Sequence, residues 1–126
     1  MTNTSAEPHY PRPAPIESYG GGGFRFAGMS HRGSLLCLPS GIWAWPVASP
    51  QEITEDSLGP VFAEAESIML LLIGTGRANF ALPEGLRARF IQSRLGVEVS
   101  RTGTAVSTYN ILVEEGRPVA AALIAA

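Results

Sequence analysis

The sequence predicts an α/β fold, a three-layer single domain with a mixed central sheet, helices on both faces and an N-terminal run of short antiparallel strands. The first observation is the run Ile68–Ile73, whose six consecutive apolar residues indicate a strand covered on both faces. The second is the pair of helical patterns before and after this run, which supply covering layers. The third is the first third of the chain, where short apolar stretches alternate with glycine and proline, as in antiparallel strands.

Length and composition indicate one globular domain. The chain has 126 residues, of which 45% are apolar and 16% are charged, and this suits a single core. We place the domain at residues 16–126. Residues 1–15 hold four prolines, and we expect them to form a disordered tail.

Charge and cysteine content exclude several partners and sites. The net charge is −2, and all nine basic residues are arginines scattered singly along the chain, so we expect no nucleic-acid partner. Cys37 is the only cysteine, which excludes an internal disulfide and a cysteine-built zinc site. We expect no metal and no cofactor. No set of residues forms a catalytic signature, so the sequence favours a protein that is not an enzyme.

The chain carries no targeting signal that we recognise. Its N-terminus lacks the apolar core of a secretory signal and the arginine-rich pattern of a transit peptide. The Ile68–Ile73 run is too short to cross a bilayer. We therefore expect a cytoplasmic protein without a membrane-spanning segment.

Glycine-rich turns separate the strands expected near the N-terminus. Ile16–Tyr19 and Phe24–Phe26 form the first two, joined by the flexible run Gly20–Gly23. This run lacks the lysine and the following helix of a phosphate-binding loop. We expect a tight turn over Met29–Arg32 and another strand at Ser34–Leu38.

Two tryptophans lie close together in the next expected strand, Gly41–Pro46. Alternation places Trp43 and Trp45 on one face of this strand and Ile42 and Ala44 on the other. Two large aromatic side chains either seal the edge of the core or remain partly exposed and anchor a protein partner. Both tryptophans are therefore candidate partner-binding residues.

Capping signals predict two helices on either side of the Ile68–Ile73 run. Thr54 is a good N-cap, and the helix that it begins is expected to be interrupted or restarted at Gly59–Pro60. A clearer helix is predicted over Pro83–Leu95, with Ile91 widening its apolar stripe and Gly96 ending it.

The C-terminal part of the sequence predicts a strand, a helix and a strand. Val97–Val99 is expected to run parallel to the Ile68–Ile73 strand. Thr102 or Thr104 caps the next helix, which Gly116 ends. The small residues of Pro118–Ile124 form the last strand and allow a helix to approach closely.

The glycine turn after the Ile68–Ile73 strand is the candidate ligand site. Gly74, Thr75 and Gly76 allow backbone N–H groups to converge at the carboxyl end of a buried strand, where ligands bind in doubly wound folds. The G-x-G-x-x-G fingerprint is incomplete, because Asn79 stands where the third glycine belongs. Asn110 is expected to satisfy backbone groups near this turn, with substrate contact as the alternative. The candidate ligand-binding residues are Gly74, Thr75, Gly76, Arg77, Asn79 and Asn110.

Several short motifs, in this order and spacing, resemble one family of small α/β domains. The motifs are Ile16–Tyr19, Gly33–Ser34, Trp43, Ile53–Leu58, Ile73–Gly76, Thr108–Asn110 and Glu115–Ile124. The family contains uncharacterised bacterial and archaeal domains and the third mitochondrial assembly factor of respiratory complex I. The resemblance spans nearly all of residues 16–126.

This resemblance implies a three-layer α/β domain. For the mitochondrial member it also implies a non-catalytic role as a partner protein in building the NADH:ubiquinone oxidoreductase. It supplies no catalytic residue to carry over. Because the chain begins without a mitochondrial leader, we expect a free-standing bacterial member.

Two hypotheses for function follow. The first is a non-enzymatic interaction protein that assists assembly of a respiratory, complex I-like, or other membrane complex, with respiratory subunits or assembly factors as partners. It predicts an exposed apolar patch near Trp43 and Trp45. The alternative is a small-ligand-binding or enzymatic domain that uses the Gly74–Gly76 turn. It predicts a concave pocket there with convergent N–H donors.

Overall fold

The computed structural model describes residues 8–126, and its largest feature is a five-stranded sheet. The strands of this sheet are Ser34–Leu38 (β4), Gly41–Trp45 (β5), Leu70–Gly74 (β6), Gly96–Ser100 (β7) and Val119–Leu123 (β8). Their order is β5-β4-β8-β6-β7. β6 runs parallel to β7 and β8, whereas β4 is antiparallel to β5 and β8, so the sheet is mixed, as predicted.

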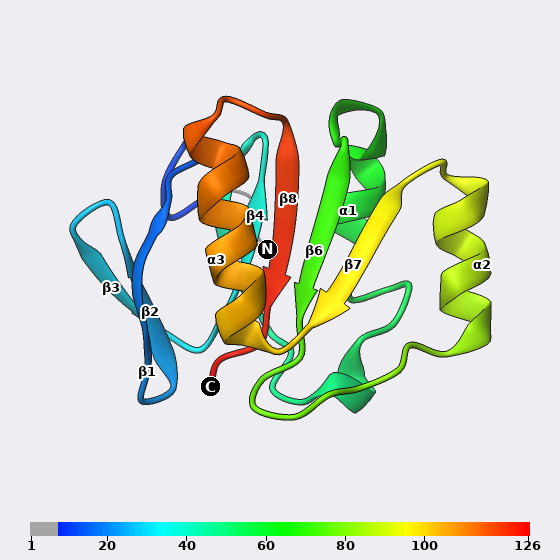
Figure 1. Cartoon of the computed structure of the whole chain (residues 1–126), viewed down its shortest axis with the longest axis horizontal. Coiled ribbons are helices and arrows are strands. Elements are labelled where there is room, and N and C mark those ends of the chain that lie inside the picture. Colours follow the sequence, from blue (N-terminus) through cyan, green and yellow to red (C-terminus); the bar gives the residue numbers. More distant parts are fainter. Residues whose placement is uncertain (1–7) are drawn as a thin grey trace, which may run out of the picture.

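Helices cover both faces of this sheet, which confirms the three-layer prediction (Figure 1). The helices are Gly59–Ala63 (α1), Glu84–Gln92 (α2) and Thr102–Glu114 (α3). Side chains of α1 and α2 join one apolar cluster on the first face, and side chains of α3 join a second cluster on the opposite face. A smaller sheet stands beside α3 and packs into the second cluster.

The apolar run at β6 is buried on both faces, as its composition predicts. Leu71 and Ile73 point into the first cluster and Leu72 into the second, and each is at most 2% exposed. β8 lies beside it in the middle of the sheet, and its three alanines are fully buried. Ala121 faces the second cluster, where its small side chain allows α3 to pack closely across β6 and β8, whereas Ala120 and Ala122 face the first cluster.

The small sheet consists of Ile16–Gly20 (β1), Gly23–Phe26 (β2) and Met29–Arg32 (β3), all antiparallel. The expected tight turn over Met29–Arg32 is wrong, because these residues form a strand. The turn lies one step earlier, at Ala27 and Gly28, whose φ values of 50° and 74° build a two-residue hairpin turn. Alanine at a positive φ is uncommon, so the sequence carried no clear signal for this turn.

The chain before β1 packs against the edge strand β5. The N–H of His9 donates to the carbonyl of Ile42 at 2.8 Å, and the N–H of Ile42 donates to the carbonyl of Tyr10 at 2.9 Å. For residues 8–15 the structure therefore differs from the expected disordered tail, whereas residues 1–7 lie outside the described residues. An edge strand offers backbone groups to any passing segment, and residue periodicity does not reveal such pairing.

The helix expected from Thr54 does not begin there. Thr54 and Ser57 cap each other, because each backbone N–H donates to the side-chain oxygen of the other, at 2.8 and 3.1 Å. Pro60 has no N–H to donate to the preceding turn, so regular helix starts only at α1, which is the predicted restart. Single 3₁₀ turns flank this region at Pro50–Glu52 and Ala65–Ser67.

The helix predicted to reach Leu95 ends earlier, at Gln92. Arg94 takes the left-handed conformation with φ 56°, and Gly96 is already the first residue of β7 rather than the end of the helix. Ile91 does not widen the inner stripe, since 77% of its surface is exposed.

α3 is the longest helix of the described residues, with 13 residues. Thr102 is its first helical residue and Arg101 is its N-cap, so neither Thr102 nor Thr104 takes the expected capping position. Gly116 follows its end with φ 77°, as predicted. Along residues 8–126, no helix combines the length and apolarity needed to cross a bilayer.

Candidate functional site

The glycine turn at the end of β6 is closed by its own neighbours. The N–H of Thr75 donates to the carbonyl of Ser100 at 2.8 Å, and the N–H of Gly76 donates to Oγ1 of Thr102 at 2.9 Å. The Thr102 hydroxyl in turn donates to the carbonyl of Ile124 at 2.6 Å. These bonds join the ends of β6, β7 and β8 to the first turn of α3. They also occupy two N–H groups that a bound anion would need.

The turn is also closely packed. A Cβ atom on Gly74 would lie 2.8 Å from the Cα atom of Thr102, so only glycine fits at that position. Gly76 has φ 88°, which again favours glycine. Thr75 is 2% exposed, and its hydroxyl donates to the carbonyl of Ala78 at 2.6 Å. The turn therefore acts as a structural joint between strands and helix.

The structure brings some of the predicted ligand-binding residues together at this turn and separates others. Arg77 is exposed and lines a hollow of about 550 Å³ together with Gly76 and Arg101, whereas Asn79 lines a separate hollow of about 360 Å³. Asn110 lies elsewhere: its side chain accepts from the N–H of Ile16 and donates to the carbonyl of Ile16, both at 2.8 Å. The expectation that Asn110 satisfies backbone groups near the glycine turn is therefore wrong, because the Asn110 side chain instead links α3 to the backbone of β1. A ligand role for the turn and for Arg77 and Asn79 stays a prediction.

The two tryptophans of β5 share one face, as predicted, but their environments differ. Trp45 is 3% exposed, and its Nε1–H donates to the carbonyl of Ser57 at 2.8 Å. Trp43 is half-buried, and its Nε1 is shielded from solvent without any acceptor among residues 8–126. Ile42 points to the opposite face and joins the second cluster. Trp45 is thus a core residue, and Trp43 is the candidate anchor.

An apolar groove of about 530 Å³ lies beside Trp43, between β4, β5 and the segment around α1. Two carboxylates line it and no basic side chain does. The Glu64 carboxylate is held by Ser40, whose N–H donates to it at 3.1 Å and whose hydroxyl also donates to it. We call this the Trp43 groove. Its lining comprises Leu36, Leu38, Trp43, Ala44, Trp45, Pro46, Asp56, Ser57, Pro60, Ala63 and Glu64.

Sequence reasoning identified the tryptophans but missed the residues that face them across the groove. The sequence carries no signal for Asp56 and Glu64 at this site, because no local pattern distinguishes an acidic residue on a groove rim from other surface acids. Thr102 was predicted as a helix cap, and its bonds to the glycine turn carried no signal in the sequence.

The buried titratable groups lie away from the Trp43 groove. Burial raises the pKa of the Cys37 thiol to about 12, and burial beside Cys37 also raises the pKa of the Tyr109 hydroxyl. Partial burial of His31 lowers its pKa from 6.5, opposed by contact with the carbonyl of Ser34. Within residues 8–126, His, Cys, Asp and Glu side chains form no cluster of three that could hold a metal ion.

Known proteins resemble this chain in sequence and in fold. It is 34% identical over 115 residues to NADH dehydrogenase (ubiquinone) 1 alpha subcomplex assembly factor 3 of Mus musculus, with 91% of this chain and 62% of the mouse protein covered. The chain thus spans about three fifths of the length of that mouse relative.

Two solved bacterial structures share the fold over nearly their whole length. One is described as an outer membrane protein from Bartonella henselae, with a TM-score of 0.89, 47% identity, and 93% of this chain and 98% of that chain covered. The other is a protein from Rhodopseudomonas palustris, with a TM-score of 0.84, 47% identity, and 100% of this chain and 93% of that chain covered. These similarities confirm the predicted fold and the resemblance based on motifs. The family described as protein of unknown function (DUF498/DUF598) matches residues 16–124, and this chain belongs to that family.

Proposed function

We propose that this chain is a non-catalytic interaction domain that assists assembly of a respiratory complex of the NADH dehydrogenase type. The observation that carries the proposal is the Trp43 groove, an apolar hollow beside a half-buried aromatic side chain. Concave apolar sites with a large aromatic residue are typical anchors for protein partners. The relatives named as assembly factors support the choice of complex.

The groove fits a short partner segment with an apolar side chain and a neighbouring lysine or arginine. The apolar side chain would pack on Trp43 and Pro60, which line the groove. Asp56 and Glu64 supply negative charge at the same site, so a basic residue in the partner adds electrostatic complementarity.

A hydrogen bond from the Trp43 indole to the partner would add to the binding free energy. A buried donor without an acceptor costs about 1–3 kcal/mol. The Nε1 atom is shielded from solvent in the free chain, so it reaches an acceptor on the partner only when the ring turns. We therefore expect the Trp43 side chain to change rotamer, and its fluorescence to change, when the groove is filled.

The proposed partners are subunits or assembly factors of the respiratory complex. We propose that the chain binds them on the cytoplasmic side of the membrane. A tagged chain expressed from its own locus would test this location by fractionation. The alternative of a ligand site at the glycine turn is not proposed, because the N–H groups of Thr75 and Gly76 already donate within the protein.

The test is deletion of the chromosomal copy in the host, followed by complementation with three versions of the chain. These are the wild type, Asp56→Lys, which reverses charge on the groove rim, and Glu114→Lys, a matched change of an exposed acid at the end of α3. The readouts are the amount of assembled NADH dehydrogenase complex on native gels and the identity of its subunits among copurifying proteins.

We expect deletion to lower the amount of assembled complex, and the wild type and Glu114→Lys to restore it. Asp56→Lys should fold normally but restore it poorly and lose the copurifying subunits. Unchanged complex after deletion contradicts the assembly role. Full restoration by Asp56→Lys contradicts the groove as the binding site.

A further inference from the structure

The free edge of the large sheet at β7 is the starting point for a second interaction surface. Within the described residues, β7 pairs only with β6 and has no strand on its other side. Figure 1 shows β7 at the edge of the sheet with α2 standing beside it. An unpaired strand edge is a template for an additional strand.

The hydrogen-bond pattern indicates which backbone groups of β7 are available. The carbonyl of Ser100 accepts from the N–H of Thr75, so Ser100 directs its backbone groups toward β6. In a parallel ladder these directions alternate along the strand. The N–H and carbonyl groups of Val97 and Val99 therefore point away from β6, toward the open edge.

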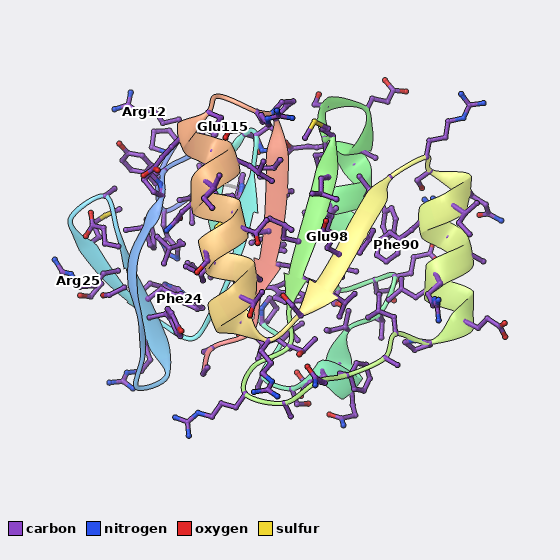
Figure 2. All side chains as sticks on the ribbon, in the orientation of Figure 1. Arg12, Phe24, Arg25, Phe90, Glu98 and Glu115 are labelled. Carbon is purple, nitrogen blue, oxygen red and sulfur yellow. The ribbon has the colours of Figure 1, made fainter. Side chains whose placement is uncertain are left out.

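An apolar groove of about 410 Å³ runs between this edge and α2. Figure 2 shows Phe90 lying between α2 and β7, where its ring forms part of the groove. Phe80, Leu82 and Leu95 add further apolar lining. Val99 is 37% exposed and Ile91 is 77% exposed, so the groove and its rim present apolar surface to solvent.

The charge at this groove is positive. Arg87 is exposed and lines the groove, and the lining contains no acidic residue. Val97 packs on the α2 side, so by alternation Glu98 points to the α3 side of the sheet and not into the groove (Figure 2). A partner with negative charge is therefore favoured over one with positive charge.

We propose that the groove between β7 and α2 binds an extended segment of a partner protein, which adds as a strand to β7. The backbone of this segment bonds to Val97 and Val99, while alternate apolar side chains enter the groove and an acidic residue lies near Arg87. Strand addition in this form takes its affinity from main-chain hydrogen bonds and its specificity from alternate side chains.

A second copy of the chain is a poorer occupant. A two-fold contact between two β7 edges places identical surfaces face to face. Each α2 stands beside its own β7, so the two helices and their Arg87 side chains would meet across the contact. A single acidic segment enters the groove without this like-charge approach.

The test begins with a library of short random peptides displayed on phage and selected on the wild-type chain. Clones that also bind Arg87→Glu are removed. We expect selected sequences that alternate apolar residues and include Asp or Glu. A synthetic copy of the strongest binder should bind Arg87→Glu about tenfold more weakly, a difference of about 1.4 kcal/mol. It should bind Arg117→Glu, an exposed control in the loop between α3 and β8 that does not line this groove, as tightly as the wild type.

Two further measurements separate strand addition from simple contact. Hydrogen exchange should show new protection of the Val97 and Val99 amides when the peptide is bound. N-methylation of alternate peptide residues, the set whose N–H groups face β7, should abolish binding, whereas N-methylation of the intervening set should leave it intact. Asp56→Lys should leave peptide binding unchanged, which separates this surface from the Trp43 groove.

Other results overturn the proposal. A library that yields no binder, selected sequences that are basic, or equal effects of the two N-methylated sets each exclude an acidic strand at this edge. If the Val97 and Val99 amides are already protected from hydrogen exchange in the free chain, and sedimentation shows a dimer, then β7 pairs with a second copy of the chain instead.

Discussion

Replacing each of the two neighbouring tryptophans by phenylalanine should have different consequences for folding stability. The two changes remove the same atoms, an indole N–H and part of a ring. In Trp45 that N–H bonds to the carbonyl of Ser57 at 2.8 Å, whereas in Trp43 it is shielded from solvent without an acceptor. The pair therefore isolates the effect of a satisfied and an unsatisfied buried donor.

The expected magnitudes follow from these environments. Trp45→Phe loses a hydrogen bond with a net contribution of about 0.5–1.5 kcal/mol and leaves space in a packed site, which adds roughly 1 kcal/mol. Trp43→Phe loses some apolar contact at a half-buried position but removes an unpaired donor that costs about 1–3 kcal/mol. We expect Trp45→Phe to lower the free energy of unfolding by about 2 kcal/mol, and Trp43→Phe to leave it unchanged or to raise it.

Urea unfolding followed by far-ultraviolet circular dichroism provides the comparison, because this signal does not depend on the tryptophans being changed. Equal m-values in the three proteins would show that the same surface is exposed on unfolding. A loss for Trp43→Phe as large as that for Trp45→Phe would refute the reasoning, since it would mean that the Trp43 N–H is paired in solution.

Three further predictions concern the joint at the glycine turn and the buried titratable groups. Thr102→Val should lower the free energy of unfolding by about 1–3 kcal/mol in the same urea assay, because the Gly76 N–H loses its acceptor. The exposed control Thr104→Val should change the free energy of unfolding by less than about 0.5 kcal/mol. Cys37 is fully buried, and burial raises the pKa of its thiol to about 12. A chromogenic thiol reagent at mildly alkaline pH should therefore modify Cys37 only after denaturation, as measured by absorbance. Rapid labelling of the native protein would contradict this burial. Burial lowers the pKa of His31 from 6.5, so the neutral form is favoured in the folded state, and its contribution to stability is present above pH 6.5 and is lost as pH falls below that value. Comparison of wild type with His31→Gln across this range should show a shallower pH dependence in the variant.

The parts of the fold that the sequence predicted are those governed by local composition. The unbroken apolar run of β6 requires cover on both faces, and the structure provides it. The small residues of β8 and the glycine that ends α3 were equally direct, whereas the N-cap of α3 is Arg101 and not one of the predicted threonines. In contrast, the β2–β3 turn depends on Ala27 at a positive φ, and glycine patterns around it pointed to the wrong residues.

The candidate site was less predictable, because it depends on contacts between distant segments. Alternation along β5 correctly placed both tryptophans on one face, yet it does not reveal that Trp45 is buried with an acceptor at Ser57 while Trp43 is half-buried without one. Asn110 was correctly expected to satisfy backbone groups, but its partner is Ile16, 94 positions away in the sequence. No local pattern encodes such a distance.

The architecture explains why the interaction surfaces are expected at the two sides of the sheet rather than at its glycine end. Internal hydrogen bonds close that end and join β6, β7 and β8 to α3. The Trp43 groove beside β5 carries carboxylates, and the groove beside β7 carries Arg87, so segments of opposite charge are favoured at the two sites. Because β4, β8 and β6 lie between β5 and β7, the two occupants would not touch each other. Binding at one groove should therefore leave the affinity of the other unchanged, so that one chain can hold two partner segments at once.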